Sequence, residues 1–252
     1  MMKRFLTVVL LLIPIAFWSC DVLQEVAGSL EEYGGQTGLT REEVTAGLKE
    51  ALKVGSVQAV NTLSARDGYF GNALYRIGFP PEAAEILKHK DHPLLQAAGI
   101  SEKIDQVEIN MNRAAEQAAG KAVPVFTDAI TAMTIGDAFA ILNGSDTAAT
   151  HYFRQHTYSK LEQLYRPVVN QALDKKFVGN ISANQAWSAL TDSYNQVASV
   201  TGWKKVNRDL STWVTRRGLD GLFLRIREEE KNIRNNPQAR VTEILRKVFG
   251  NN

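Results

Sequence analysis

The chain has very little cysteine: Cys20 is the only one among 252 residues. A single cysteine cannot form an intramolecular disulfide, so the fold must be stabilised by packing whatever compartment it occupies. The sequence also lacks an apolar run of the roughly 20 residues that a membrane-spanning helix needs. Its longest apolar stretch, from Phe5 to Trp18, holds about 14 residues and contains Pro14, so it does not predict a transmembrane anchor.

Three signatures of common enzymes are missing from the chain: the phosphate-binding loop G-x-x-x-x-G-K-[ST], the dinucleotide fingerprint G-x-G-x-x-G and the nucleophile elbow G-x-S-x-G. Their absence disfavours the common nucleotide-dependent enzymes and the serine hydrolases, and no cofactor is predicted. Catalysis by a thiol requires a free cysteine, which Cys20 does not supply if it is acylated.

The charge of the chain is balanced rather than of one sign. The first 19 residues hold two of the 29 basic residues and none of the 27 acidic ones, so the remaining chain carries 27 of each. Without a basic excess to neutralise phosphates, the sequence predicts no nucleic acid among its partners. An apolar content of 44% and a charged content of 22% are typical of a globular protein.

The N-terminus has the layout of an export signal that ends at a lipid-acceptor cysteine. Lys3 and Arg4 precede the apolar run, and Ser19 stands directly before Cys20. This pattern predicts a lipoprotein signal peptide over residues 1–19 and a thioether-linked diacylglycerol on the cysteine sulfur. A plainly secreted protein and an uncleaved anchor are the alternatives. Acyl chains would anchor the protein in a membrane of the cell envelope, where it faces the periplasm.

A tether and a folded body are expected after the acylated cysteine. Residues 20–39 are polar and rich in glycine, which is typical of a flexible linker. Asp21 would favour the inner membrane by the sorting rule of enteric-type bacteria, but other lineages do not follow that rule, so inner or outer membrane stays open. From Thr40, which has capping-box spacing with Glu43, we expect one helical domain over residues 40–252.

Helical periodicity runs through this body. The clearest segment extends from Ser101 to Met133, where apolar residues, many of them alanine, recur on one narrow arc. Alanines allow a neighbouring helix to approach closely, so this segment should be a central helix, kinked or interrupted at Pro124. A shorter helix should follow Gly136 and end at Asn143-Gly144 with a left-handed residue.

The remaining elements are also predicted to be mainly helical. Helices are expected at residues 146–175, 183–197, 209–235 and 241–249, another should open at Pro80-Pro81, and a short extended piece is plausible at residues 74–77. The last amphipathic helix should dock onto the body. Together these patterns predict an all-α fold, a single helical bundle with short connections and little or no strand.

A candidate interior polar cluster consists of Asn112, Arg113, Glu116, Asp137 and Asp220. The asparagine and the glutamate lie one turn apart on the flank of the central apolar stripe, and both aspartates sit among apolar helical residues. A buried carboxylate costs several kcal/mol unless it is paired, so each needs an arginine, an amide or a proton. Structural pairing is the simpler interpretation. Two converging carboxylates could instead act as an acid and a base.

The four histidines do not predict a metal site. His151 and His156 lie about 140° apart around a helix and so cannot share an ion. His89 and His92, even with Asp91 between them, offer too few ligands for zinc.

Three further features of the C-terminal third have a structural and a functional interpretation. Gly218 and Gly221 within one predicted helix favour close packing, with a ligand or partner at the backbone as the alternative. The charge run at residues 228–234 is interpreted as a solvated helix face. Core packing is the interpretation for the aromatic residues, with a carbohydrate or peptide groove as the alternative; they are Trp187, Tyr194, Trp203 and Trp213.

Several short motifs occur in one order along the body: Asn112-Arg-Ala-Ala-Glu116, Met133-Thr-Ile-Gly-Asp137-Ala, Ile141-Leu-Asn-Gly144, Ala148-Ala-Thr-His-Tyr-Phe153, Leu219-Asp-Gly-Leu-Phe223 and Ile233-Arg-Asn-Asn-Pro237. In these motifs the chain resembles the bacterial family catalogued as domain of unknown function forty-one ninety-seven, over roughly Leu39 to Gly250. The resemblance implies an exported, mainly helical bacterial protein and carries no activity or catalytic residue.

The sequence thus favours a lipid-anchored helical module that binds an envelope protein or a small ligand of unknown identity. The alternative is a hydrolase-type enzyme that uses Glu116 with Asp137 or Asp220 on an interior cleft. A third hypothesis is a helical subunit that docks on a partner through the glycine-lined face at Gly218.

Overall fold

The computed structural model describes residues 39–84, 100–176, 181–202, 205–240 and 242–249. The chain divides into two units, Met1–Arg41 and Glu42–Asn252, and nearly all described residues belong to the second. Among the described residues there is no strand, only one isolated antiparallel bridge between Lys176 and Ser182. The structure therefore confirms the all-α fold.

Several predicted features lie outside the described residues. They are the signal peptide at 1–19, Cys20 with most of its tether, His89 and His92, and the side chains of Tyr194 and Trp203.

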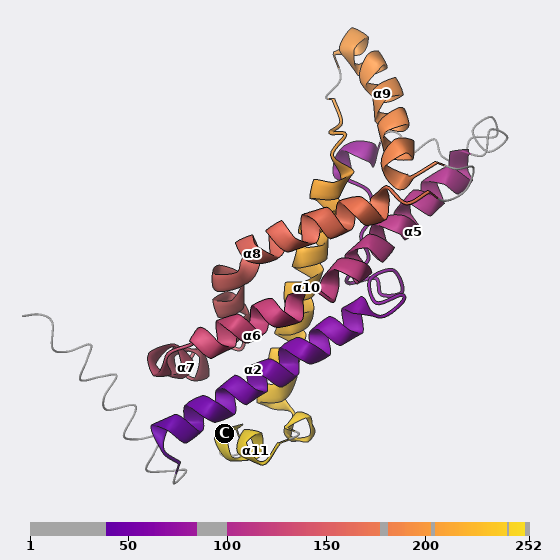
Figure 1. Cartoon of the computed structure of the whole chain (residues 1–252). Coiled ribbons are helices and arrows are strands. Elements are labelled where there is room, and N and C mark those ends of the chain that lie inside the picture. Colours follow the sequence, from indigo (N-terminus) through magenta and orange to yellow (C-terminus); the bar gives the residue numbers. More distant parts are fainter. Residues whose placement is uncertain (1–38, 85–99, 177–180, 203–204, 241, 250–252) are drawn as a thin grey trace, which may run out of the picture. The chain divides into compact units, whose positions relative to one another are not determined.

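The helices follow one another along the chain as shown in Figure 1: α2 (Arg41–Ser64), α5 (Ile100–Ala119), α6 (Ala122–Ala132), α7 (Ile135–Leu142), α8 (Ala148–Leu173), α9 (Ala183–Thr201), α10 (Leu210–Asn235) and α11 (Glu243–Phe249). Short 3₁₀ turns occupy Pro81–Ala83 and Pro237–Ala239. Helix α8 packs against α5, α6, α7 and α10.

The predicted central helix is divided into α5 and α6, and the break precedes Pro124 instead of falling on it. Gly120 and Lys121 separate the two helices, and the proline lies in the first turn of α6. A proline ring clashes with the carbonyl group four residues earlier, which here belongs to Gly120. The interruption therefore appears one turn upstream of the residue that causes it.

Helix α7 begins with a capping box and ends without the expected left-handed residue. Thr134 and Asp137 exchange side-chain and backbone hydrogen bonds at its N-terminus. At its C-terminus Asn143 is right-handed, with φ of −85°, and Gly144 has no positive φ. A Cβ atom on Gly144 would lie 2.7 Å from the Cβ of Ala148. Close approach of the next helix, not backbone handedness, therefore explains the glycine.

The alanine stripe of α5 allows close helix packing, as expected. Ala114, Ala115, Ala118 and Ala119 have no exposed surface. A Cβ atom on Gly218 of α10 would lie only 3.4 Å from the Cβ of Ala115, so small residues face each other across the α5–α10 contact. This close packing offsets the loss of helix propensity at the glycine, which is about 1 kcal/mol.

The second glycine of α10 accommodates a fully buried tyrosine. A Cβ atom on Gly221 would lie 2.8 Å from the Tyr69 ring, and the Tyr69 hydroxyl donates to the carbonyl oxygen of Gly218 at 2.7 Å. Burial raises the pKa of Tyr69 well above its ordinary value, so the hydroxyl stays protonated and donates. The glycine-lined face is occupied by this chain's own residues, which argues against the partner-docking hypothesis.

The segment at residues 74–77, expected to be extended, is a turn followed by irregular chain. Its backbone is held by a side chain of α5. The amide of Asn112 accepts from the N–H of Ile77 at 2.8 Å and donates to the carbonyl oxygen of the same residue at 2.9 Å. A side-chain amide thus supplies the pair of hydrogen bonds that a neighbouring strand would provide.

Candidate functional site

Glu116 on α5 is buried and fully paired. It accepts from the backbone N–H groups of Tyr69 at 3.3 Å and Phe70 at 3.4 Å, and from the Arg113 guanidinium at 2.7 Å. Arg113 also contacts Asp67 at 2.7 Å. Asp67 itself has a positive φ of 66°, in a turn that these contacts hold. The predicted pairing with an arginine and with amides is thus present, and it fixes the loop after α2 onto α5.

The other two carboxylates of the predicted cluster lie in other contacts. Asp137 caps α7 through Thr134. Asp220 on α10 binds Arg154 at 3.1 Å and Arg217 at 2.6 Å. Among the described residues, neither aspartate shares a bonding partner with Glu116. The structure therefore does not form the converging pair of carboxylates that the hydrolase hypothesis requires.

Replacing Asp137 with asparagine should change the acid dependence of stability. Hydrogen bonds from the backbone and then the side chain of Thr134 lower the pKa of Asp137. A lowered pKa in the folded state gives stability that is present above the unfolded pKa of about 3.9 and is lost as pH falls through the folded value. Urea unfolding should show the variant less stable by about 0.5–1 kcal/mol at pH 7, with a smaller difference near pH 2. A difference that stays constant with pH would contradict this account.

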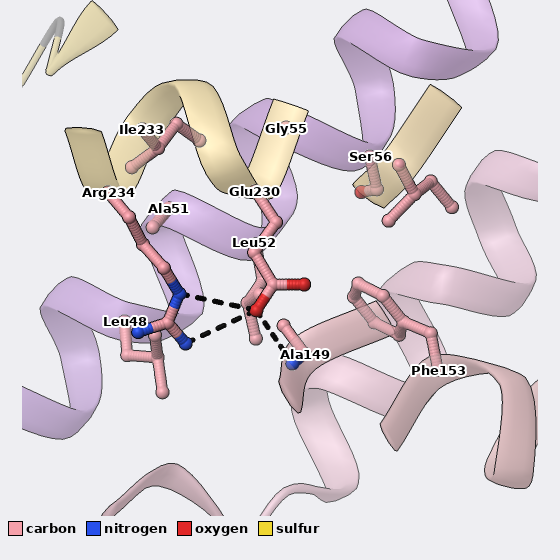
Figure 2. Close-up of a pocket in the computed structure, with 11 residues that line it drawn as sticks. Leu48, Ala51, Leu52, Gly55, Ser56, Ala149, Phe153, Glu230, Ile233 and Arg234 are labelled. Atoms are coloured by element: carbon pink, nitrogen blue, oxygen red, sulfur yellow. Dashed lines mark hydrogen bonds and ion pairs between the residues drawn. The ribbon is translucent and has the colours of Figure 1, made fainter. Parts of the chain in front are cut away.

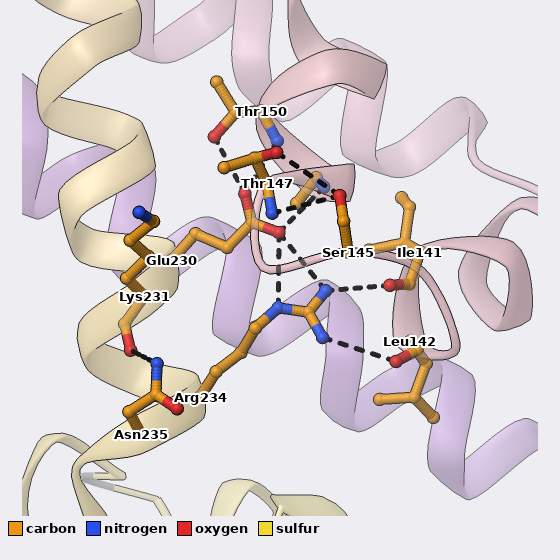
Figure 3. Close-up of polar contacts among 10 residues, drawn as sticks. Ile141, Leu142, Ser145, Thr147, Thr150, Glu230, Lys231, Arg234 and Asn235 are labelled. Atoms are coloured by element: carbon orange, nitrogen blue, oxygen red, sulfur yellow. Dashed lines mark hydrogen bonds and ion pairs between the residues drawn. The ribbon is translucent and has the colours of Figure 1, made fainter.

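A buried ion pair that the sequence did not predict joins α10 to the ends of two other helices (Figure 3). Glu230 accepts from the backbone N–H groups of Ala149 and Thr150 at 2.9 Å each, and from the Thr150 hydroxyl at 2.8 Å. These amides belong to the first turn of α8, whose N–H groups have no partner within the helix. The carboxylate therefore caps α8 from outside its own segment.

Arg234 completes the same network on the opposite side. Its guanidinium contacts Glu230 at 3.2 Å and donates to the carbonyl oxygens of Ile141 at 2.8 Å and Leu142 at 3.3 Å (Figure 3). These carbonyls end α7, where a cation is favourable. One ion pair of α10 thus fixes both ends of the connection between α7 and α8.

The interpretation of residues 228–234 as a solvated face is therefore wrong for two of its acidic residues. Glu229 and Glu230 are each only 8% exposed. A signal was present in the spacing, because Glu230 continues the apolar arc through Leu219, Phe223 and Ile226. The charges of these residues suggested that their side chains face solvent. The groups that make the burial of Glu230 possible come from a segment about 80 residues earlier in the chain.

A small cavity lies beside this ion pair (Figure 2). Its volume is about 30 Å³, and α2, α8 and α10 enclose it. Leu52, Phe153 and Ile233 give it apolar walls, with Glu230 and Arg234 at its edge. A water molecule needs about 10–15 Å³ of such volume, so the cavity has room for about two water molecules and is too small for an organic ligand.

A larger groove, which we call the α8–α10 groove, lies between α8 and α10. It has a volume of about 240 Å³ and is lined by Thr147, Thr150, His151, Arg154, Asp220, Phe223, Leu224 and Arg227. Polar residues and an apolar floor meet here, which is typical of small-molecule sites. The Glu230 network borders it, because Thr150 belongs to both.

Arg154 is held in place within the α8–α10 groove. Its guanidinium bonds to Asp220 and lies 5.1 Å from the Tyr158 ring centroid and 5.4 Å from that of Phe223. Arg227 is exposed and has no ion pair or hydrogen bond with any described residue. The groove thus combines one oriented cation with one that is free to bind an anion.

The remaining candidate residues from the sequence make contacts that serve the fold. Trp187 is buried and donates to the carbonyl oxygen of Asn207, while Trp213 donates to that of Gly78. His156 stacks on Tyr152. No group of three or more metal-ligating side chains occurs in the part of the chain that the structure describes.

Among the described residues, no single helix combines the length and the apolar character needed to cross a membrane. The segments Ile104–Ala132 and Ile135–Leu142 meet these criteria only as a pair bent by 106°, and many of their apolar residues are buried in the bundle.

Comparison with known proteins gives one match. The family model described as protein of unknown function (DUF4197) matches residues 38–250. No curated protein and no solved structure matches the chain. The family match covers nearly all of the described body, including α5 with Glu116, α7, and the ion pair and groove on α8 and α10. The chain therefore belongs to this family of proteins of unknown function.

Proposed function

We propose that the protein is a lipid-anchored helical module that faces the periplasm and binds a ligand or an envelope partner through the α8–α10 groove. The observation that carries the anchor is the position of the sole cysteine, Cys20, directly after a basic and then apolar N-terminus. Two or three acyl chains on that residue would give firm membrane attachment, at about 0.8 kcal/mol per buried methylene group.

Binding is favoured over hydrolysis by the contacts of the carboxylates. Glu116 is tied to Arg113 and two amides, and Asp220 to two arginines, so both carboxylates already have structural partners. The α8–α10 groove, in contrast, presents a cation without a described partner next to an apolar floor. A cation of this kind beside an apolar surface can bind an anionic ligand, which supports a role in recognition.

Metabolic labelling tests the anchor directly. Cells that express the full chain are fed an alkyne analogue of palmitate, and the label on the protein is detected after coupling to a fluorophore. We expect the wild type to be labelled and Cys20→Ser to lose the label completely, because no other cysteine exists. Ser19→Ala, which keeps the cysteine, serves as the matched control and should remain labelled. An unlabelled wild type, or equal labelling of Cys20→Ser, would overturn the proposal.

A further inference from the structure

We infer that the α8–α10 groove binds a small amphipathic oxyanion, a carboxylate or phosphate that carries a short apolar group. This inference rests on the proposed binding function and names its ligand class. The volume of about 240 Å³ lies below the range of about 300–1,000 Å³ typical of drug-sized ligands, so the ligand is small.

The charges around the groove favour an anion. Asp220 is bound by both Arg154 and Arg217, so one positive charge remains after that carboxylate is neutralised. Arg227 adds a second cation, with no acidic partner among the described residues. Glu230, which binds the groove residue Thr150, is neutralised by Arg234. The two guanidinium groups that line the groove, those of Arg154 and Arg227, match the hydrogen-bonding geometry of a carboxylate or phosphate.

The floor of the groove favours an apolar group next to that anion. Phe223 and Leu224 line it, and the guanidinium of Arg154 lies over the Phe223 ring. Contact with the ring and the bond to Asp220 hold Arg154 in one orientation, so less side-chain entropy is lost when the anion binds.

Additional donors lie at the α8 end of the groove. The ring of His151 has no hydrogen bond to any described residue and can donate an N–H. Within the described segments, the Thr147 hydroxyl has Ser145 as its one neighbour in hydrogen-bond range. The main-chain amides of the first turn of α8 are not the site, because Glu230 already occupies those of Ala149 and Thr150.

A titration of the full chain in a neutral detergent tests this inference. Hexanoate is the probe, and the amide shifts of His151, Arg154 and Leu224 are followed by transverse-relaxation-optimised NMR. Acetate, which lacks the apolar group, and hexanol, which lacks the charge, are the matched ligand controls. Hexyl phosphate and dihexanoyl phosphatidylglycerol below its micelle concentration distinguish a free anion from a lipid headgroup.

Arg227→Gln is the decisive variant, because the Arg227 side chain makes no hydrogen bond or ion pair with the described residues that the fold would lose. We expect it to weaken hexanoate binding at least about tenfold, as loss of a charge-assisted hydrogen bond does. Lys231→Gln removes an exposed cation one turn away on the same helix, outside the groove, and should leave the affinity unchanged.

Each outcome of the titration either supports or overturns the proposed ligand class. Hexanoate or hexyl phosphate that binds more tightly than acetate and hexanol, with dependence on Arg227, supports a free ligand. Binding of the phosphatidylglycerol alone, with the same dependence, supports a headgroup as the source. Absence of binding by every probe, or equal affinity in Arg227→Gln, overturns the inference. The palmitate labelling does not depend on this result, so failure of the ligand class and failure of the anchor are distinguishable.

Discussion

Replacing Glu230 by alanine is expected to lower the free energy of unfolding by about 3–5 kcal/mol, because it leaves a buried charge without its partner. The side chain of Arg234 is only 13% exposed and would lose its carboxylate. The N–H groups of Ala149 and Thr150 would also lose their acceptor at the start of α8. Urea unfolding followed by circular dichroism measures the change.

Two further variants make the Glu230 prediction specific. Glu230→Gln keeps an oxygen that can accept from one amide but removes the charge, so an intermediate loss is expected. Glu162→Ala removes an exposed partner of Arg216, at 3.5 Å, and should cost less than about 1 kcal/mol. If Glu230→Ala were no more destabilising than Glu162→Ala, the ion pair would not hold α7 and α8 together.

Replacing Asn112 by alanine is expected to cost about 2–4 kcal/mol. Asn112 has no exposed surface, and its amide satisfies both the N–H and the carbonyl oxygen of Ile77. Each buried backbone group that is left without a hydrogen bond costs about 1–3 kcal/mol. The loop before the first 3₁₀ turn should also loosen, which faster hydrogen exchange at the Ile77 amide would report.

Asn110→Ala is the matched control for Asn112→Ala. Asn110 lies on the same helix and donates only to the carbonyl oxygen of Gln106, one turn before it. Its removal leaves no buried group unpaired and should change the free energy of unfolding by less than about 0.5 kcal/mol. Similar losses for the two variants, or unchanged exchange at Ile77, would show that Asn112 does not hold this loop.

The hydrogen bonds of Glu230 also bear on the proposed binding function. Glu230 fixes the first turn of α8, and that turn contributes Thr150 and His151 to the α8–α10 groove. Recognition sites are most precise when packed helices hold the contacting groups. The groove variant Arg227→Gln leaves this support intact, so it changes binding without removing the scaffold.

Part of the candidate site followed from the sequence because its contacts are local or nearly so. Arg113 and Glu116 lie one turn apart on α5, and a buried carboxylate was expected to need an arginine, an amide or a proton. The cap formed by Asp137 is equally local, since its partner Thr134 is three residues away. The α8–α10 groove was not predicted, because no spacing within either helix indicates which side chains the two helices bring together.

The sequence by itself determined the helical fold class, the small residues that allow helices to pack closely and the family to which the chain belongs. Periodicity, caps and glycine positions act within a few residues, so they can be read from neighbours along the chain. Tertiary structure alone decided that Glu230 is buried against Arg234 and that Asp220 binds two arginines while Glu116 binds loop amides. It also decided that the Arg227 side chain has no partner among the described residues. Burial and pairing depend on groups brought together from segments up to about 90 residues apart, and their free energy exists only once the helices have packed.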